Sequence, residues 1–236
     1  PFDHKVKLAQ FYYAEESHIR DAISSSLKAK HNWSRTSFDT RASIFLKAAD
    51  LISTKYRNEI LAATILGQGK TIFQAEIDAV AELADFLRFN VYFASEVLKY
   101  KPISTTDATN ELVYRPTEVG FWVGIPPFNF TAIAGNLVSA PVLMGNVALW
   151  KPSDTSVYSN YLVYRIFKEA GLPDGVINFV PSDGPLFGRI ISSHPHLAGI
   201  NFTGSTATYR LLLKLVGSNI DNFRSYPRLI GGMFIS

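Results

Sequence analysis

Residues 119–150 read VGFWVGIPPFNFTAIAGNLVSAPVLMGNVALW and carry the strongest signal for the architecture. A short apolar run over 119–125 leads into two prolines, and a helix-like stretch over 131–144 follows. A second apolar run closes the segment at 147–150. Short apolar runs bounded by turn residues are typical of strands buried on both faces. A strand, a helix and a second strand in this order predict a βαβ unit with parallel strands.

The same alternation continues towards the C-terminus. The pattern predicts further buried strands over 176–180 and 197–202, and further helices over 156–170, 185–193 and 205–216. Gly171, followed by Pro173, is a stop signal for the helix over 156–170. The sequence therefore predicts the α/β class, with a Rossmann-type, doubly wound parallel sheet. Ligands of such sheets bind beyond the carboxyl ends of the strands.

The part of the chain before this alternation is helical in pattern. It contains no proline between Phe2 and Pro102. Asp39 or Thr40 is predicted to cap a helix, because apolar residues follow from Ile44 at helical spacing. The polar stretch over 104–110 then predicts an exposed loop or hairpin.

Composition limits the classes of function. The 236 residues carry 23 basic and 20 acidic side chains, a net charge of +3. This surplus is small and evenly spread, so the sequence predicts neither a nucleic-acid partner nor an anionic membrane surface. No run approaches the roughly 18 apolar residues of a membrane span. The chain has no cysteine, which excludes disulfides, thiolate metal sites and a cysteine nucleophile within these residues, and no metal site is predicted.

Asn129 is a candidate catalytic residue directly after the first strand. It lies in a turn that two prolines fix and aromatic residues enclose. An amide held in this way can donate a hydrogen bond to a developing oxyanion. The alternative is that Asn129 caps the helix beginning near Thr131, and the pattern alone favours this capping role.

Polar turns follow the other three strands as well. Lys151 and Asp154 follow the second strand and suit the hydroxyls of a ribose. After the third strand, Gly184 and Gly188 would let a flat group approach the backbone, and the residues over 204–208 offer a phosphate site at a helix N-terminus. Each turn has a plain alternative as a cap or a solvated turn. Four polar turns on one sheet edge nevertheless predict a nucleotide-binding α/β domain.

Three of these motifs also carry a family resemblance. They are Pro127-Phe128-Asn129-Phe130, Lys151-Pro152-Ser153-Asp154 and Phe202-Thr203-Gly204-Ser205. In this order and spacing they resemble the aldehyde dehydrogenase superfamily. Phe128, Thr131 and Tyr209, with the stretches over 74–78, 87–90 and 227–229, are similar to its 1-pyrroline-5-carboxylate dehydrogenase group. The resemblance implies NAD-dependent oxidation of L-glutamate γ-semialdehyde to L-glutamate, in proline degradation.

The resemblance also implies a role for individual residues. Asn129 matches the amide that stabilises the oxyanion, and Glu82 and Phe130 match positions near the aldehyde. The cofactor-binding residues that we predict are Pro126, Lys151, Ser153, Asp154, Gly184, Gly188, Gly204, Ser205, Thr206, Ala207 and Thr208. Relatives often carry serine at position 126, so Pro126 is expected to make only backbone or packing contacts.

The family's reaction needs a cysteine nucleophile and a glutamate base, and neither has a match here. Gly232 stands where relatives carry the glutamate. We therefore expect the cofactor-binding part of such an enzyme with its catalytic domain truncated, inactive alone. One alternative is a non-catalytic form that binds NAD or pairs with full-length subunits. Another is a nucleotide-binding module unrelated to dehydrogenases.

The expected organisation follows from this resemblance. We predict an N-terminal helical part of the cofactor-binding domain over 1–103, a hairpin or loop for oligomerisation over 104–118, a Rossmann-type NAD-binding part over 119–231, and an unrelated tail over 232–236. In full-length form a homo-oligomer is expected. The expected compartment is the mitochondrial matrix for a eukaryotic source and the cytoplasm for a bacterial one.

Overall fold

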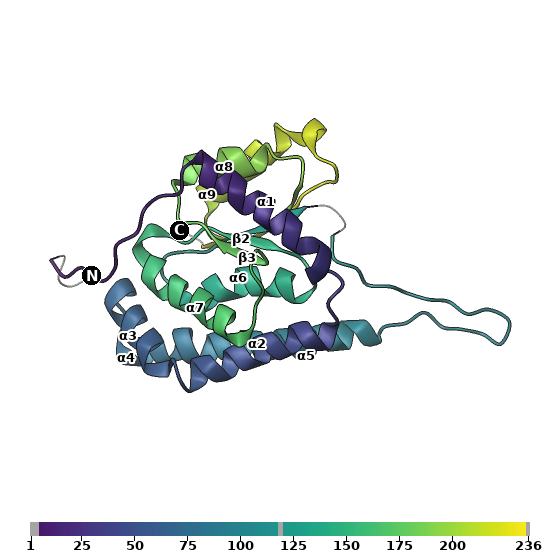
Figure 1. Cartoon of the computed structure of the whole chain (residues 1–236), viewed down its shortest axis with the longest axis horizontal. Helices are drawn as coiled ribbons and strands as arrows, with labels where there is room; N and C mark the ends of the chain where they lie inside the picture. The colour runs from purple at the N-terminus through teal and green to yellow at the C-terminus, as the bar shows by residue number, and fades with distance from the viewer. Residues whose placement is uncertain (1–4, 118–119, 235–236) are drawn as a thin grey trace.

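A computed structural model describes residues 5–117 and 120–234 of the chain (Figure 1). The first residue of the predicted strand over 119–125 and the last two residues of the predicted tail lie outside this described part. Every strand in it belongs to one parallel sheet of order β3-β2-β1-β4-β5. The strands are β1 (Phe121–Ile125), β2 (Ala148–Trp150), β3 (Ile177–Phe179), β4 (Leu197–Ser205) and β5 (Arg228–Phe234). The predicted α/β class and parallel sheet are confirmed.

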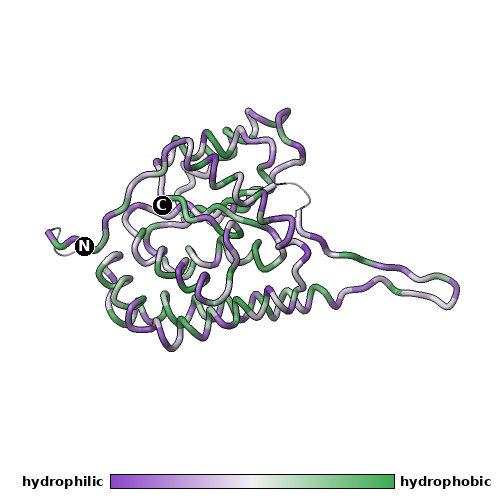
Figure 2. The backbone as a smooth tube through the Cα atoms, viewed as in Figure 1, coloured by the Kyte–Doolittle hydropathy of each residue, from purple (hydrophilic) through white to green (hydrophobic). Residues whose placement is uncertain are grey.

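Helices cover both faces of this sheet (Figure 1). One face carries α1 (Glu16–Trp33), α8 (Gly184–Ser192) and α9 (Thr206–Gly217). The other carries α6 (Thr131–Leu143) and α7 (Val157–Ala170), and the outer helices α2 (Phe38–Ser53) and α5 (Leu83–Lys99) pack against these two. The remaining helical segments are α3 (Arg57–Gln68), α4 (Ile72–Ala75), the π-helix η1 (Glu76–Glu82), and the 3₁₀ turns η2 (Asp154–Ser156) and η3 (Ile220–Asn222). Burial on both faces explains why β1 and β2 are apolar along their length (Figure 2).

The centre of the core is aromatic. Trp150 at the end of β2 is fully buried, and its ring lies 5.4 Å from that of Phe179 and 6.4 Å from that of Phe167, between ring centroids. Phe167 also packs edge-on against Phe45 of α2. These contacts join the sheet to α7 and to the outer helix layer in one continuous core.

Two local predictions about helix ends have different outcomes. Gly171 ends α7 in the left-handed conformation, with φ of 114°, so the predicted stop is confirmed. The predicted cap of α2 is wrong. Ser37 caps this helix, because its Oγ accepts a hydrogen bond from the backbone N–H of Thr40 at 3.2 Å, while Asp39 and Thr40 lie in the first turn.

The predicted strand over 197–202 is too short, since β4 continues to Ser205. The reason is its neighbour. β5 pairs with β4 along its length, from Gly199 opposite Arg228 to Ser205 opposite Phe234. Residues 203–205, expected to begin a turn, are therefore held in the ladder, and the predicted tail takes part in the sheet up to Phe234.

A long segment between α5 and β1 leaves the body of the molecule and folds back on itself (Figure 1). Residues 100–117 contain no helix or strand. Near its tip the backbone N–H of Thr105 donates to the carbonyl of Ala108 at 2.9 Å. Its part in subunit pairing stays a prediction. No helix in the described residues combines the length and apolar composition that crossing a membrane requires.

Candidate functional site

Parallel pairing brings the ends of four strands to one edge of the sheet. Gly124 of β1 pairs with Trp150, and Trp150 pairs with Phe179 of β3. On the other side Ile125 pairs with Phe202 of β4. The turns that follow β1, β2 and β3 and the end of β4 therefore lie along the same edge, as the sequence predicts.

Helix α6, which follows β1, is capped by a side chain from a distant part of the sequence. Asp78, in η1, accepts hydrogen bonds from the backbone N–H groups of Thr131 at 3.0 Å and Ala132 at 2.8 Å. Its side chain is 2% exposed and its Oδ2 lies 2.6 Å from Nζ of Lys70. A carboxylate at a helix N-terminus satisfies free N–H groups and interacts favourably with the helix dipole. The alternative in which Asn129 caps α6 is therefore wrong.

Because Asp78 takes the capping role, Asn129 is left without a partner. Its Oδ1 is buried and makes no hydrogen bond within the described residues. A buried polar atom without a partner costs free energy unless a ligand or water satisfies it. Its Nδ2, the atom that could donate to an oxyanion, also has no hydrogen-bond partner among the described residues. An amide N–H left without a partner next to the end of β1 can donate to a ligand or to an oxyanion.

Glu82 and Phe130, both predicted to lie near a substrate, share Lys70 as a neighbour. The ammonium of Lys70 lies 4.2 Å from the ring centroid of Phe130. The pKa of Glu82 is raised, first by burial and then by the charge of Asp78, while Lys70 partly opposes the shift. Glu82 also lines a cavity of about 760 Å³. The other lining residues are Ile77, Ala81, Asp85, Phe86, Phe89, Asn90, Phe93 and Asn136.

Replacing Asp78 with asparagine is expected to lower the pKa of Glu82, because the substitution removes a nearby negative charge and frees Lys70. NMR titration of the Glu82 side chain measures the change, with Glu96→Gln on α5 as the control. In the parent chain the raised pKa means that ionised Glu82 opposes folding. The free energy of unfolding is therefore expected to fall as pH rises from the ordinary glutamate pKa through the raised pKa of Glu82 in the folded chain. An unchanged or higher pKa in Asp78→Asn would contradict the assignment.

The turn after β2 contains Lys151, whose ammonium interacts electrostatically with two carboxylates. Burial lowers the pKa of Lys151, and Asp154 and Asp183 partly offset this shift. Nζ of Lys151 donates to the carbonyl of Pro152 at 3.1 Å. Asp154 does not cap α7, whose N-cap residue is Ser156, and its Oδ2 accepts a hydrogen bond from the hydroxyl of Tyr13 at 2.7 Å. Ser153 directly precedes Asp154 in this turn, and Pro126 opens the neighbouring turn after β1.

The turn after β3 leads into α8, which Asp183 caps by accepting a hydrogen bond from the backbone N–H of Leu186 at 3.0 Å. Gly184 has open space where a Cβ would lie. Gly188, one turn later, faces α9, because a Cβ there would lie 3.5 Å from Cδ1 of Leu215. The roles of both glycines in cofactor binding stay predictions.

The end of β4 leads directly into α9. Gly204 and Ser205 are the last residues of the strand, and Ser205 accepts a hydrogen bond from the N–H of Thr208 at 3.2 Å. Thr206, Ala207 and Thr208 form the first turn of the helix. Free N–H groups of such a first turn attract phosphate. In the described part of the chain no group of three or more His, Cys, Asp or Glu residues is placed to hold a metal ion.

Residues 1–225 match the aldehyde dehydrogenase family. The chain belongs to this family. The resemblance that the sequence motifs carry is therefore confirmed. Within the family, the chain is 55% identical over 231 residues to the protein named delta-1-pyrroline-5-carboxylate dehydrogenase, mitochondrial, of Homo sapiens, covering 98% of this chain. It is 51% identical over 234 residues to a probable delta-1-pyrroline-5-carboxylate dehydrogenase of Schizosaccharomyces pombe, again covering 98% of this chain.

Solved structures of the family have the same fold. The Mycobacterium tuberculosis delta-pyrroline-5-carboxylate dehydrogenase bound with NAD and cobalamin superimposes with a TM-score of 0.95 at 49% identity, over 97% of this chain and 43% of that one. A 1-pyrroline-5-carboxylate dehydrogenase from Thermus with bound NAD gives 0.87 at 29% identity, over 95% and 43%. The chain spans 41% of the length of the human relative and 42% of the fission yeast one.

Sequence reasoning missed three members of this site. Lys70 carries no motif, and the stretch over 74–78 predicts no capping role for Asp78. Tyr13 lies far from Asp154 along the chain, so no local pattern links the two.

Proposed function

We propose that this chain is the cofactor-binding part of an NAD-dependent dehydrogenase that oxidises L-glutamate γ-semialdehyde to L-glutamate in proline degradation. The observation that carries the proposal is the unpartnered amide of Asn129 at the end of β1, on the sheet edge that also holds Lys151. The names of the relatives, at 51–55% identity, support this reaction.

The residues of this edge fit a dinucleotide. Lys151 and Asp154 offer a donor and an acceptor for ribose hydroxyls, and burial lowers the pKa of Lys151. The first turn of α9 offers N–H groups to a diphosphate. Two relatives were solved with bound NAD, which supports NAD as the cofactor.

In the proposed reaction, NAD supplies the acceptor for the hydride that leaves the aldehyde carbon. Asn129 donates a hydrogen bond to the aldehyde oxygen as negative charge develops on it. Glu82 and Phe130 line the approach to that oxygen. The thiol nucleophile and the glutamate base have no counterpart in residues 1–236, which contain no cysteine. We therefore propose that these residues bind the cofactor without turning over an aldehyde.

Two further parts of the proposal concern partners and compartment. The protruding segment over 104–117 is the proposed contact for pairing with a second subunit, since its backbone is exposed beyond the body of the fold (Figure 1). The human relative's name includes the word mitochondrial. For a eukaryotic source this supports the mitochondrial matrix.

Lys151→Ala is expected to weaken NAD binding about tenfold or more, because it removes a charged donor to the ribose. Isothermal titration of the purified chain with NAD measures the effect. Lys28→Ala, on the exposed surface of α1, is the matched control and should bind as the parent chain does. Absence of saturable NAD binding by the parent chain would contradict the proposal, as would unchanged affinity in Lys151→Ala.

A turnover assay tests the proposed inactivity of this chain. With semialdehyde and NAD present, no formation of NADH is expected. NADH formation that Asn129→Ala abolishes would overturn the proposed inactivity.

A further inference from the structure

Two cavities lie at the amino ends of the strands, on the edge opposite to the proposed cofactor site. Thr117 precedes β1, Ala198 lies at the beginning of β4, and Arg228 is the first residue of β5. All three line one cavity of about 380 Å³. The other residues that line it are Arg115, Pro116, Arg224 and Ser225.

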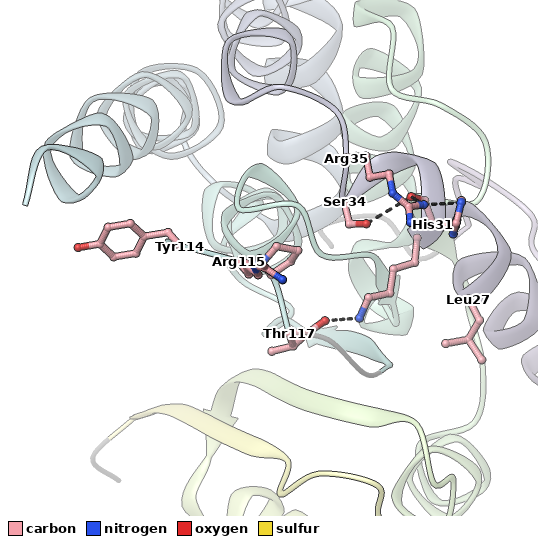
Figure 3. Close-up of a pocket in the computed structure, with 9 residues that line it drawn as sticks. Leu27, His31, Ser34, Arg35, Tyr114, Arg115 and Thr117 are labelled. Atoms are coloured by element: carbon pink, nitrogen blue, oxygen red, sulfur yellow. Dashed lines mark hydrogen bonds between the residues drawn. The ribbon is translucent and has the colours of Figure 1, made fainter. Parts of the chain in front are cut away.

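A larger cavity of about 580 Å³ adjoins it (Figure 3). The two cavities share Arg115, Pro116 and Thr117. The larger one is also lined by residues of α1 and the turn after it, which are Leu27, Lys30, His31, Ser34 and Arg35, and by Tyr114. The segment over 115–117 therefore borders both cavities.

The lining of both cavities is basic. Arg115, Arg224 and Arg228 line the smaller cavity, and Arg35 and Lys30 line the larger one. No carboxylate side chain lines either cavity within the described residues, and none of the three arginines of the smaller cavity forms an ion pair there. The like charges of Arg115, Arg224 and Arg228 repel one another, and a bound anion would reduce that cost.

The backbone between the cavities is held by polar contacts. Oδ1 of Asn146 accepts hydrogen bonds from the backbone N–H and the hydroxyl of Thr117, at 3.0 and 2.6 Å. Lys30 donates to the carbonyls of Thr117 and Gly120. On the far side, the backbone N–H of Arg224 donates to the carbonyl of Pro195 at 3.0 Å. The arginines therefore project from anchored segments.

A neighbouring imidazole responds to this charge. The pKa of His196 is lowered, first by burial and then by the positive charges of Arg224 and Lys30. The ring of His194 lies 5.7 Å from that of His196, between centroids, and the pKa of His194 is lowered first by burial and then by the charge of His196. The imidazole of His196 therefore lies in a positive potential at this edge.

We propose that the two adjoining cavities form a binding site for a diphosphate-bearing anion, separate from the proposed NAD site. Guanidinium groups match phosphate oxygens with paired hydrogen bonds, and three of them approach one hollow from two chain segments. Because the two cavities share Arg115, they suit an anion with two linked phosphate groups better than an anion with a single phosphate. Arg115, Arg224 and Arg228 are exposed to solvent, so binding is expected to weaken as salt is added.

Titration of the chain with inorganic pyrophosphate tests the proposal. Saturable binding is expected, and the double variant Arg224→Ala/Arg228→Ala should weaken it tenfold or more. The matched control, Arg88→Ala/Arg165→Ala, removes the same charge from exposed sites on other helices and should leave binding unchanged. NAD affinity should be unchanged in Arg224→Ala/Arg228→Ala, so failure of this site is distinguishable from failure of the proposed function.

An NMR titration gives a local readout. Pyrophosphate is expected to raise the pKa of His196 in the parent chain, because a bound anion offsets the charge of Arg224. Absence of saturable binding would overturn the proposal. Pyrophosphate binding that excess NAD abolishes and Arg224→Ala/Arg228→Ala leaves intact would also overturn it, since the anion would then occupy the cofactor edge.

Discussion

Asp78→Ala is expected to lower the free energy of unfolding by about 3–5 kcal/mol, the range found when one partner of a buried ion pair is removed. The side chain is 2% exposed, and it satisfies Lys70 together with the backbone N–H groups of Thr131 and Ala132. Alanine leaves the ammonium and both N–H groups without this partner. Denaturant unfolding, followed by circular dichroism, measures the loss.

Two further variants separate the charge from the cap. Asp78→Asn keeps one acceptor for the N-terminus of α6 and is expected to lose less stability than Asp78→Ala. Asp85→Ala, an exposed carboxylate on the next helix, is the matched control and should change stability by no more than about 0.5 kcal/mol. Equal stability of Asp78→Ala and Asp85→Ala would show that the buried network does not hold α6.

The same residue shows where sequence reasoning reached its limit. The order of strands and helices after β1 follows from local apolar runs, and the structure confirms that order. The cap of α6 does not follow from any local pattern, because Asp78 precedes Thr131 by 53 positions. Asn129 occupies a position where asparagine is a frequent cap, so local propensity favoured the wrong partner. Only the packing of η1 against α6 decides between them.

The end of β4 is a second case of the same kind. A glycine followed by hydroxyl residues is typical of a turn, and the sequence predicts one from Thr203 onwards. The ladder with β5 keeps these residues extended up to Ser205. Strand length is decided by the neighbouring strand, and no window of sequence around Gly204 contains that neighbour.

The predicted site residues differ in how far local pattern could place them. Those of the turns after β1, β2 and β3 lie on one edge because parallel strands end there, which the βαβ pattern already implies. Two contacts depend on tertiary packing: the hydrogen bond from Tyr13 to Asp154, and the cation–π contact of Lys70 with Phe130. The sequence therefore predicts which edge carries the site but not which of its polar groups already have partners.

Gly120→Ala is expected to lose more than about 4 kcal/mol of stability, a size reserved for severe clashes or strain. Gly120 has φ of +93°, and a Cβ there would lie 1.7 Å from the carbonyl oxygen of His196. That carbonyl accepts the hydrogen bond of the Phe121 N–H at 3.0 Å. The methyl group would therefore push apart β1 and β4 where their pairing begins.

Gly217→Ala provides the control, because nothing lies within 4 Å of its would-be Cβ and its φ is not positive. Alanine at this last residue of α9 is expected to be neutral or to stabilise the chain by up to about 1 kcal/mol. Thermal and denaturant unfolding of both variants, with the soluble yield of each, decide the comparison. A Gly120→Ala chain as stable as Gly217→Ala would show that the start of β1 can move away from His196. The pairing of β1 with β4 would then not depend on the close approach of Gly120 to the carbonyl of His196.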